Sequence, residues 1–284
     1  MSFDPRLTPA RPDLAAARLR GKVEAERFVD GVARRLIVPA TPLKREPRPD
    51  APYETEALAG EPVTVYDEQE GWAWVQLETD GYVGWLAAQA LGPAEPAPTH
   101  RVAALRTFLY PGPSIKMEPL GFLSLGARVT VLRLDGAFAA TTIGFVHAGH
   151  LAGLDEVERD YVSVAARFVG APYLWGGKSS LGLDCSGLVQ LSLDAAGVRA
   201  PRDSDMQAAR LGAVLPLDDP QLRRGDLVFW KGHVGIMEDA GTLLHANGHH
   251  MAVAREPLAE AIARIQQKSH GPVTAYRRPT GGLG

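Results

Sequence analysis

The chain contains 284 residues, which is long for one domain and suits two or three. Hydrophobic residues make up 45% of it and charged residues 22%, so the chain is not disordered as a whole. The net charge of −3 argues against a surface that binds nucleic acid or an anionic membrane. The single cysteine excludes an intrachain disulfide and is therefore buried filler, a chemical liability or a nucleophile.

The first 31 residues predict a short N-terminal helical segment. A weakly amphipathic run, Leu14–Phe28, is closed by the turn residues Asp30 and Gly31. The longest apolar run here is Leu14–Ala17, whereas a secretory signal needs about 7–15 apolar residues. The sequence also has no apolar stretch of about 18 residues that would span a bilayer. It therefore predicts a cytoplasmic protein, with an unusual export route or an upstream start site as the alternatives.

Residues 32–92 predict a small all-β domain. Short β-type runs are separated by turn residues, and fifteen of the 22 prolines precede residue 120. Trp72 and Trp74 alternate with period two, as do Val83 and Trp85, which is typical of half-buried strands in a small barrel. The predicted strands are Arg35–Val38, Glu61–Tyr66, Trp72–Leu77 and Gly81–Leu86. A stiff, proline-rich linker, Gly92–Pro98, follows.

Residues 99–153 predict a second, divergent unit of the same kind. Asp135 and Gly136 predict a hairpin turn within it. The ends of the two units are alike, because Gly81–Leu86 and Ile143–His147 both close a β unit of about 55 residues. The predicted strands of the second unit are Arg101–Thr107, Ala127–Leu134, Ala137–Thr141 and Ile143–Val146. A repeated small barrel is therefore predicted.

Residues 155–280 predict an α+β domain, because helical patterns come first and strand patterns follow. The predicted helices are Glu156–Phe168, Asp184–Ala196, Ser204–Leu211 and Leu258–Gln266. The predicted strands are Asp226–Trp230, His233–Ile236 and Thr242–Ala246. The fold class predicted for the whole chain is thus multidomain, with two small all-β barrels before an α+β domain.

Cys185 is the strongest candidate for a chemical role. It lies in the first turn of a predicted helix, where unpaired backbone N–H groups and the helix dipole favour the thiolate. The glycine-rich run Tyr173–Gly177 precedes it and offers pocket walls and a close backbone approach. A lone cysteine is more often a buried structural residue. The helix start, the glycine-rich approach and a downstream pair of histidines favour a nucleophile here.

Two histidines follow on neighbouring predicted strands. If Met237–Gly241 forms the turn, His233 pairs directly with His245, and both imidazoles lie on one face of a hairpin with Cβ atoms about 5 Å apart. One histidine then acts as general base to the cysteine, and the other orients it. Each histidine alone is more often an ordinary surface or core residue. A metal site of His233, His245, His249 and His250 is a further alternative, but the set lacks an established ligand spacing, so neither a metal nor a cofactor is predicted.

Residues 155–280 resemble a papain-like cysteine peptidase domain of the NlpC/P60 family. The resemblance rests on six motifs in this order: Tyr173–Gly177 (YLWGG), Asp184–Val189 (DCSGLV), Arg202–Gln207 (RDSDMQ), Gly225–Trp230 (GDLVFW), His233–Ile236 (HVGI) and His245–Ala246 (HA). Residues 32–153 resemble two bacterial SH3 (SH3b) domains, the first more clearly than the second. The chain is most similar to family members with an N-terminal SH3b pair, which are γ-D-glutamyl-L-diamino acid endopeptidases.

The resemblance implies a cysteine peptidase that hydrolyses murein peptides between D-γ-glutamate and the following diamino acid. It implies that Cys185 is the nucleophile, that His233 is the general base and that His245 orients the base. Tyr173 matches the tyrosine that helps to stabilise the oxyanion in this family. The implied substrate is a peptide with a free N-terminal L-alanine, as in the recycling of cell-wall peptides.

The predicted substrate-binding residues come from both parts of the chain: Glu61, Tyr82, Asp184, Trp175, Ser186 and Ser204. We expect the first barrel to close the non-primed end of the cleft, with Glu61 and Asp184 pairing with the L-alanine ammonium. Asp184 is also predicted to cap the following helix. Trp175 and Trp230 are predicted to wall the pocket, with ordinary core packing as the alternative. For Glu61 and Tyr82 the simpler alternative is a solvated loop acid beside a barrel-core tyrosine.

Two alternatives to a recycling peptidase stay open. One is an exported cell-wall endopeptidase or autolysin that is held by its SH3b domains, and the other is a binding module with an inactive papain-like domain. The absence of a signal argues against the first, and the complete set of Cys185, His233 and His245 argues against the second. The predicted partner is a murein-derived peptide, and neither nucleic acid nor a membrane is expected. The choice between meso-diaminopimelate and lysine, and the oligomeric state, are left open.

Overall fold

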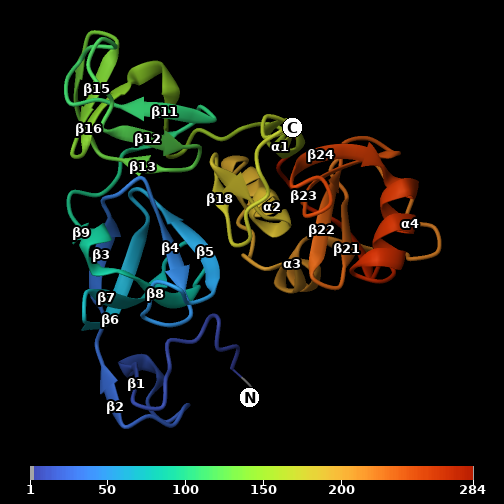
Figure 1. Ribbon diagram of the computed structural model, residues 1–284, viewed down its shortest axis with the longest axis horizontal. Coiled ribbons are helices and arrows are strands. Elements are labelled where there is room, and N and C mark those ends of the chain that lie inside the picture. Colours follow the sequence, from blue (N-terminus) through green and yellow to red (C-terminus); the bar gives the residue numbers. More distant parts are fainter. Residues whose placement is uncertain (1–2, 284) are drawn as a thin grey trace. The chain divides into compact units, whose positions relative to one another are not determined.

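The computed structural model describes residues 3–283, which divide between Leu154 and Asp155 into two units (Figure 1). Strands outnumber helices in both units, and each unit has hydrophobic clusters of its own. No helix within residues 3–283 is both long enough and apolar enough to cross a membrane.

The N-terminal segment forms a pair of strands, and the helix predicted there is wrong. β1 (Leu14–Ala16) pairs in parallel with β2 (Arg27–Val29), and the segment between them contains only the 3-10 turn η1 (Ala17–Leu19). The apolar side chains of this segment form one cluster with aromatic residues of the next sheet: Leu14, Ala16, Leu19, Tyr66, Trp74 and Trp85. Packing of these apolar side chains against the aromatic rings favours strands over a helix, because a short, weakly amphipathic run has little helical stability of its own.

Residues 32–93, the first β segment, form one sheet with the strand order β5-β4-β8-β7-β6-β3-β9. Its elements are β3 (Val32–Leu36), β4 (Ala40–Lys44), β5 (Tyr53–Leu58), β6 (Pro62–Gln69), β7 (Trp72–Leu77), β8 (Val83–Ala87), the 3-10 turn η2 (Ala88–Ala90) and β9 (Leu91–Pro93). The two predicted strands are confirmed, and Trp74 on β7 and Trp85 on β8 are direct partners whose ring centroids lie 6.5 Å apart. Both faces of these strands are buried, however, so the half-buried setting predicted for them is wrong. The sequence pattern does not predict β4 and β5, since proline and charged residues interrupt it.

Residues 100–153, the second β segment, form three small sheets with the orders β13-β10-β17, β11-β12 and β14-β15-β16. Its elements are β10 (His100–Val102), β11 (Arg106–Leu109), β12 (Gly121–Ser124), β13 (Arg128–Val129), β14 (Val131–Asp135), β15 (Phe138–Thr141), β16 (Gly144–His147), the 3-10 turn η3 (Ala148–His150) and β17 (Leu151–Gly153). The predicted hairpin turn is confirmed, because Asp135 pairs with Phe138. Both β segments end with a 3-10 turn between two strands, a shared ending that favours a repeat.

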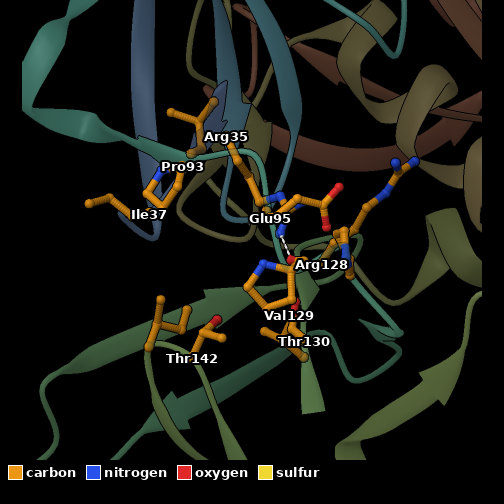
Figure 2. A pocket seen from close by; sticks show the side chains of 13 residues that line it. Arg35, Ile37, Pro93, Glu95, Arg128, Val129, Thr130 and Thr142 are labelled. Carbon is orange, nitrogen blue, oxygen red and sulfur yellow. Dashed lines mark hydrogen bonds between the residues drawn. The ribbon is translucent and has the colours of Figure 1, made fainter. Parts of the chain in front are cut away.

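A pocket of about 220 Å³ lies between the two β segments (Figure 2). Arg35 of β3 reaches across to the linker, where its guanidinium donates hydrogen bonds to the backbone carbonyls of Ala94 and Pro96. The pocket is also lined by Glu95 and Arg128. The proline-rich linker is therefore held by side-chain hydrogen bonds in addition to its own stiffness.

The second unit contains an antiparallel sheet with the order β20-β25-β21-β22-β23-β24. Its strands are β20 (Ala213–Leu215), β21 (Leu227–Trp230), β22 (His233–Met237), β23 (Thr242–Asn247), β24 (Ala252–Pro257) and β25 (Ala275–Arg278). A separate pair of short strands, β18 (Lys178–Ser179) and β19 (Gly182–Leu183), precedes α2. The helices are α1 (Tyr161–Ala166), α2 (Cys185–Ala195), α3 (Ser204–Arg210) and α4 (Leu258–Lys268).

Helices α2 and α4 flank the strands that carry the two histidines (Figure 1). On α4, Ala261 and Ile265 pack against a cluster that includes Met237 and Leu243 of the sheet. Helix α2 contacts β22 and β23 and is buried along almost all of its length. The predicted helix 156–168 is shorter than expected, because α1 begins only after Asp160, whose carboxylate caps it.

Candidate active site

Cys185 is the first residue of α2, and the geometry of this helix start fixes its position. Asp184 is the N-cap and accepts a hydrogen bond from the backbone N–H of Gly187 at 2.6 Å. Gly187 allows the first turn to lie close to the preceding loop, because a Cβ there would be 2.2 Å from the carbonyl oxygen of Gly177. The cysteine is buried, with 7% of its surface exposed. The predicted cap and helix start are thus confirmed.

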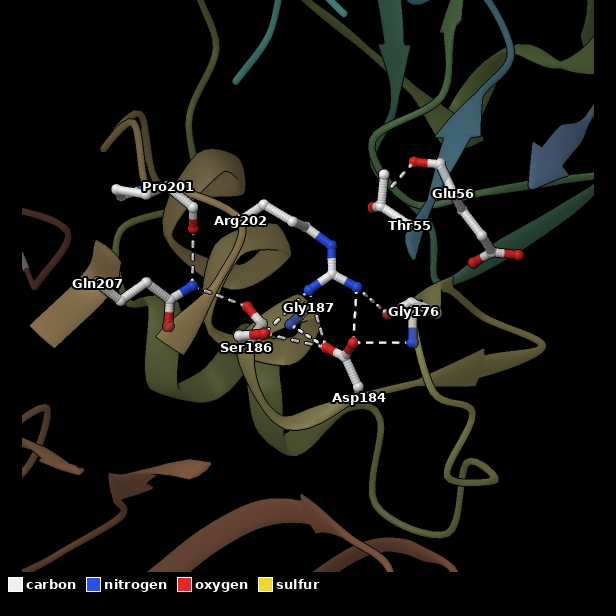
Figure 3. Close-up of polar contacts among 10 residues, drawn as sticks. Thr55, Glu56, Gly176, Asp184, Ser186, Gly187, Pro201, Arg202 and Gln207 are labelled. Atoms are coloured by element: carbon white, nitrogen blue, oxygen red, sulfur yellow. Dashed lines mark hydrogen bonds and ion pairs between the residues drawn. The ribbon is translucent and has the colours of Figure 1, made fainter. Parts of the chain in front are cut away.

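Asp184 is the centre of a buried polar network (Figure 3). The Arg202 guanidinium donates to both of its carboxylate oxygens, at 2.9 Å and 2.7 Å. The carboxylate also accepts from the Gly176 N–H at 2.9 Å and from the Ser186 hydroxyl at 3.2 Å. Arg202 is only 1% exposed, so this ion pair lies inside the domain. Asp184 and Ser186, both predicted to bind substrate, therefore also hold the helix start together.

The surroundings of Cys185 favour its neutral thiol. Burial, and after it the charge of Asp184, raise the pKa of the Cys185 thiol to about 12, against the lowering effects of a Val234 backbone hydrogen bond and of Arg202. The thiolate expected from the helix N-terminus is therefore not the resting form, because lost hydration outweighs the helix dipole. The hydrogen bond from the Val234 backbone also places β22 beside the thiol.

Alkylation measures this property directly. We expect the rate of reaction of Cys185 with iodoacetamide to rise about tenfold for each pH unit between pH 7 and 10, because only the thiolate attacks and its fraction grows in proportion below the pKa. The rate constant is obtained from the loss of unmodified protein by mass spectrometry at each pH. A rate that levels off below pH 8 would contradict the neutral thiol.

His233 and His245 form a hydrogen-bonded chain that ends on a carboxylate. Nε2 of His233 lies 2.8 Å from Nδ1 of His245, and Nε2 of His245 lies 2.6 Å from Oε1 of Glu256. The guanidinium of Arg264 donates to the same Glu256 oxygen. Since a carboxylate only accepts, His245 carries its proton on Nε2 and accepts the Nε2–H of His233 at Nδ1. Nδ1 of His233 is then the nitrogen without a proton.

The electrostatics of this chain hold both imidazoles neutral. Burial, and after it the charges of His245 and His270, lower the pKa of His233 well below its usual value. Burial also lowers the pKa of His245, against the raising effect of Glu256. Burial by itself raises the pKa of Glu256, but the hydrogen bond from His245 and the positive charge of Arg264 lower it overall, so this carboxylate is ionised. General-base catalysis by a histidine requires a neutral imidazole and a protonated thiol, and His233 lies next to Val234, whose backbone contacts the thiol.

His233 and His245 lie on one face of the sheet, as predicted, but the predicted pairing is wrong. Strands β22 and β23 pair Ile236 with Leu244, which shifts the register by two residues from the expected one. A shift of two keeps every side chain on its face, whereas a shift of one would have separated the histidines. Gly235 lies next to His245, and a Cβ at Gly235 would be 3.2 Å from the His245 Cβ.

Glu256 and Arg264 are the site residues that the sequence analysis does not identify. Glu256 lies on β24, a strand that ends in a charged, proline-containing stretch and is not predicted. Arg264 lies on α4, where a charged residue is ordinarily part of a solvated face. The signal that identifies Glu256 is strand pairing: Leu243 pairs with Glu256, so Glu256 and His245 point to the same side of the sheet.

Tyr173 is electrostatically coupled to the thiol. Burial, and after it the charges of Cys185 and Asp184, raise the pKa of Tyr173. The phenol therefore keeps its proton and is able to donate a hydrogen bond to an oxyanion. Its backbone N–H donates to the carbonyl of Met251 at 2.9 Å, which ties this loop to the turn before β24.

The predicted pocket walls lie in two different settings. Trp230 is buried, and its ring centroid lies 5.6 Å from that of His233. His270 stacks on the same imidazole at 5.3 Å, a contact that the sequence analysis does not identify. Trp175 is 68% exposed, so the core-packing alternative is wrong for it, and its contact with substrate stays a prediction. Ser204 is the buried first residue of α3, and its contact with substrate stays a prediction.

Glu61 and Tyr82 both have structural settings within the first β segment. Glu61 is 4% exposed, and its carboxylate accepts from the Leu58 N–H at 3.0 Å and from the Thr79 hydroxyl. Tyr82 is 2% exposed and belongs to the core of this segment. Tyr82 is thus a barrel-core tyrosine, as the simpler alternative expects. Glu61 is buried, so it is not the solvated loop acid of that alternative. Substrate binding by either residue stays a prediction.

Comparisons with known proteins match parts of both units. Residues 170–269 match the model of the NlpC/P60 family, and residues 43–91 match that of the bacterial dipeptidyl-peptidase Sh3 domain. The γ-D-glutamyl-L-lysine dipeptidyl-peptidase of Bacillus subtilis (strain 168) is 32% identical over 221 residues, which are 69% of this chain and 73% of that protein. A Bacillus cereus protein of the same name is 28% identical over 238 residues, or 72% of this chain and 70% of that protein.

The fold is also found among solved structures. A crystal structure of an NlpC/P60 family protein from Bacillus cereus superposes with a TM-score of 0.73 and 22% identity, and the match covers 87% of this chain and 99% of that one. Fold and sequence together define a peptidase with a bacterial SH3 domain ahead of its catalytic domain. The chain belongs to the NlpC/P60 family.

Proposed function

We propose that this protein hydrolyses peptides derived from peptidoglycan at the bond between D-γ-glutamate and the following diamino acid, on peptides with a free N-terminal L-alanine. The observation that carries the proposal is the chain from His233 through His245 to Glu256, which starts on β22, the strand whose backbone contacts the buried Cys185 thiol. The proposed bond is supported by the name of the two Bacillus relatives, whose matches span most of this chain. A role in recycling, a cytoplasmic location, and the domain limits 32–92, 99–153 and 155–280 are parts of the same proposal.

The proposed mechanism follows from the proton positions in the site. Sγ of Cys185 attacks the scissile carbonyl carbon while its proton passes to Nδ1 of His233. The Tyr173 hydroxyl donates a hydrogen bond to the oxyanion that forms. His233 then gives the proton to the leaving amine, and the C–N bond breaks to leave a thioester on Cys185. Water, deprotonated by the same imidazole, hydrolyses the thioester and restores the thiol.

The tripeptide L-Ala-γ-D-Glu-meso-diaminopimelate and its L-lysine analogue test the substrate. We expect release of the dipeptide L-Ala-γ-D-Glu from at least one of them, followed by mass spectrometry. The same peptides with an acetylated N-terminus should be poor substrates, because the ammonium can no longer pair with a carboxylate. Equal cleavage of free and acetylated peptides would contradict recognition of the amine, and no cleavage of any of them would contradict the proposed bond.

A buried carboxylate of the first β segment is proposed to pair with that ammonium. Glu61→Gln is expected to lower kcat/KM for the free peptide more than tenfold, or about 1.4 kcal/mol, and to change the rate for the acetylated peptide little. Glu56 of β5 is the matched control, since it is 5% exposed in the same sheet. An equal loss for both peptides in Glu61→Gln, or a loss selective for the free amine in Glu56→Gln alone, would overturn the assignment to Glu61.

A further inference from the structure

Three potential metal ligands meet at the outer end of the histidine chain. One ligand atom each from His245, His250 and Glu256 lies within 4.8 Å of the other two. His245 is buried, Glu256 is half-buried and His250 is exposed, so the cluster opens to solvent on one side. Within residues 3–283, this is the group of potential metal ligands whose donor atoms lie close together. It shares His245 and His250 with the four-histidine set considered from the sequence, and Glu256 takes the place of His233 and His249.

The donor set suits a zinc ion. Two imidazoles and one carboxylate, with a fourth position left for water, form a common Zn²⁺ coordination sphere. Donor atoms around tetrahedral Zn²⁺ lie about 3.3 Å apart, so modest side-chain rotations close the cluster. The carbonyl oxygen of the Asn247 side chain accepts from the His250 backbone N–H at 2.8 Å and from His250 Nδ1 at 3.0 Å. This contact orients the His250 ring, as partners of metal-bound histidines do.

We propose that Zn²⁺ binds to His245, His250 and Glu256 and switches the enzyme off by reversing the tautomers of the histidine chain. The inference rests on the proposed function, because it concerns the same general base. Without metal, Nε2 of His245 holds a proton that it donates to Glu256. A zinc ion on that nitrogen needs its lone pair, so neutral His245 must carry its proton on Nδ1.

The reversal passes to the catalytic histidine through the 2.8 Å contact between His233 Nε2 and His245 Nδ1. With a proton on Nδ1, His245 donates to His233 instead of accepting, and His233 must hold its own proton on Nδ1. The proton displaced from His245 Nε2 is balanced by one taken up at His233 Nδ1, so each imidazole stays neutral. His233 then has no lone pair to accept the thiol proton.

Arg264 competes with the zinc ion for the Glu256 carboxylate. Its guanidinium donates to the Glu256 oxygen that also accepts from His245, and a zinc ion has to displace it. The side chain of Arg264 is 18% exposed, so it has solvent to move into. Arg264→Gln removes a positive charge from the cluster and is expected to tighten zinc binding at least threefold.

Zinc binding is measured without turnover, by titrating ZnCl₂ into the full-length Cys185→Ala protein in a calorimeter. Removal of the thiol excludes it as a ligand. We expect one Zn²⁺ per chain, with Kd raised at least tenfold by His250→Ala in the same background. His249→Ala is the matched control, because His249 is the exposed neighbour and lies outside the cluster. Equal Kd values for the two histidine variants, or no binding, would overturn the site.

The tautomer reversal is observed by long-range ¹H–¹⁵N NMR of the imidazoles in the same Cys185→Ala protein. We expect the His245 proton to move from Nε2 to Nδ1 as zinc is added, and the His233 proton to move from Nε2 to Nδ1 with it. Zinc bound without this exchange would overturn the switch and leave the proposed peptidase function untouched.

Activity provides the third measurement. Zinc is expected to inhibit the otherwise wild-type enzyme, and His250→Ala should keep its metal-free rate within about twofold while losing this inhibition. Inhibition that persists unchanged in His250→Ala would overturn the proposal. If the peptides are not cleaved at all, the proposed function fails, while calorimetry and NMR still decide the zinc site.

Discussion

Replacing Cys185 by alanine is expected to abolish peptide hydrolysis, lowering kcat/KM by about 10⁴-fold or more, because no other group can form the thioester. The fold should be retained. Alanine is smaller and apolar, and the position at the start of α2 is defined by the Asp184 cap and by Gly187, neither of which the substitution touches. The measurements are the rate of dipeptide release and the thermal unfolding temperature.

A matched control lies two turns further along the same helix. Ser192 is fully buried, and its hydroxyl has no hydrogen-bond partner within the described residues. Ser192→Ala therefore removes one buried heteroatom, as Cys185→Ala does, without touching the site. We expect full activity from this variant. Normal hydrolysis by Cys185→Ala, or an equal loss in both variants, would show that the nucleophile lies elsewhere.

Loss of the Arg202 guanidinium is expected to have the largest effect on stability. Arg202 is 1% exposed and donates to both oxygens of Asp184, and its removal leaves a buried carboxylate without its counter-ion. Breaking a buried ion pair at one partner costs about 3–5 kcal/mol, so Arg202→Met should lower the free energy of unfolding by that amount. The measurement is urea unfolding of the whole chain, followed in the second unit by the fluorescence of Trp230 and Trp175.

Arg255 provides the comparison. It forms an ion pair with Glu238 at 2.5 Å, but 43% of its side chain is exposed. Solvent screens such a pair, so Arg255→Met should cost at most about 1 kcal/mol. The double variant Asp184→Asn with Arg202→Met should be more stable than Arg202→Met alone, because the stranded charge is gone. Similar losses for the two arginine variants would contradict a structural role for the buried pair.

The parts of this protein that the sequence predicts are those fixed by local pattern. Trp72–Leu77 forms β7 with the predicted limits, because alternation of large apolar residues specifies a strand by itself. Helix α2 begins at Cys185, within one residue of the predicted start, because Asp184 is a strong cap. The conformation of the N-terminal run Leu14–Phe28 could not be predicted from its own pattern, because it is determined by packing against Trp74 and Trp85, which lie far along the chain.

The candidate site is predictable only in part for a related reason. Cys185 and the histidines lie in recognisable motifs, and an even register shift kept His233 and His245 on one face. Glu256 depends on β24, which pairs with the preceding strand β23 across a short turn but gives no clear strand pattern, because charged residues and a proline interrupt it. The protonation of the thiol depends on how deeply it is buried, a property of the packed structure and not of the helix start.

Gly235 shows that alignment of the proposed base depends on a residue with no functional group. A Cβ there would lie 2.6 Å from Cδ1 of Leu243 and 3.2 Å from the Cβ of His245, so any substitution has to move the Leu243 side chain and shift His245 by a few tenths of an ångström. Such a shift strains the 2.8 Å contact between the two imidazoles, although the thiol and both histidines are still present. In a library of variants of this enzyme, inactive members with an intact thiol and both histidines should therefore concentrate at this glycine. Redesign of the enzyme for new substrates therefore has to keep a glycine at position 235, because a side chain there would collide with its neighbours Leu243 and His245.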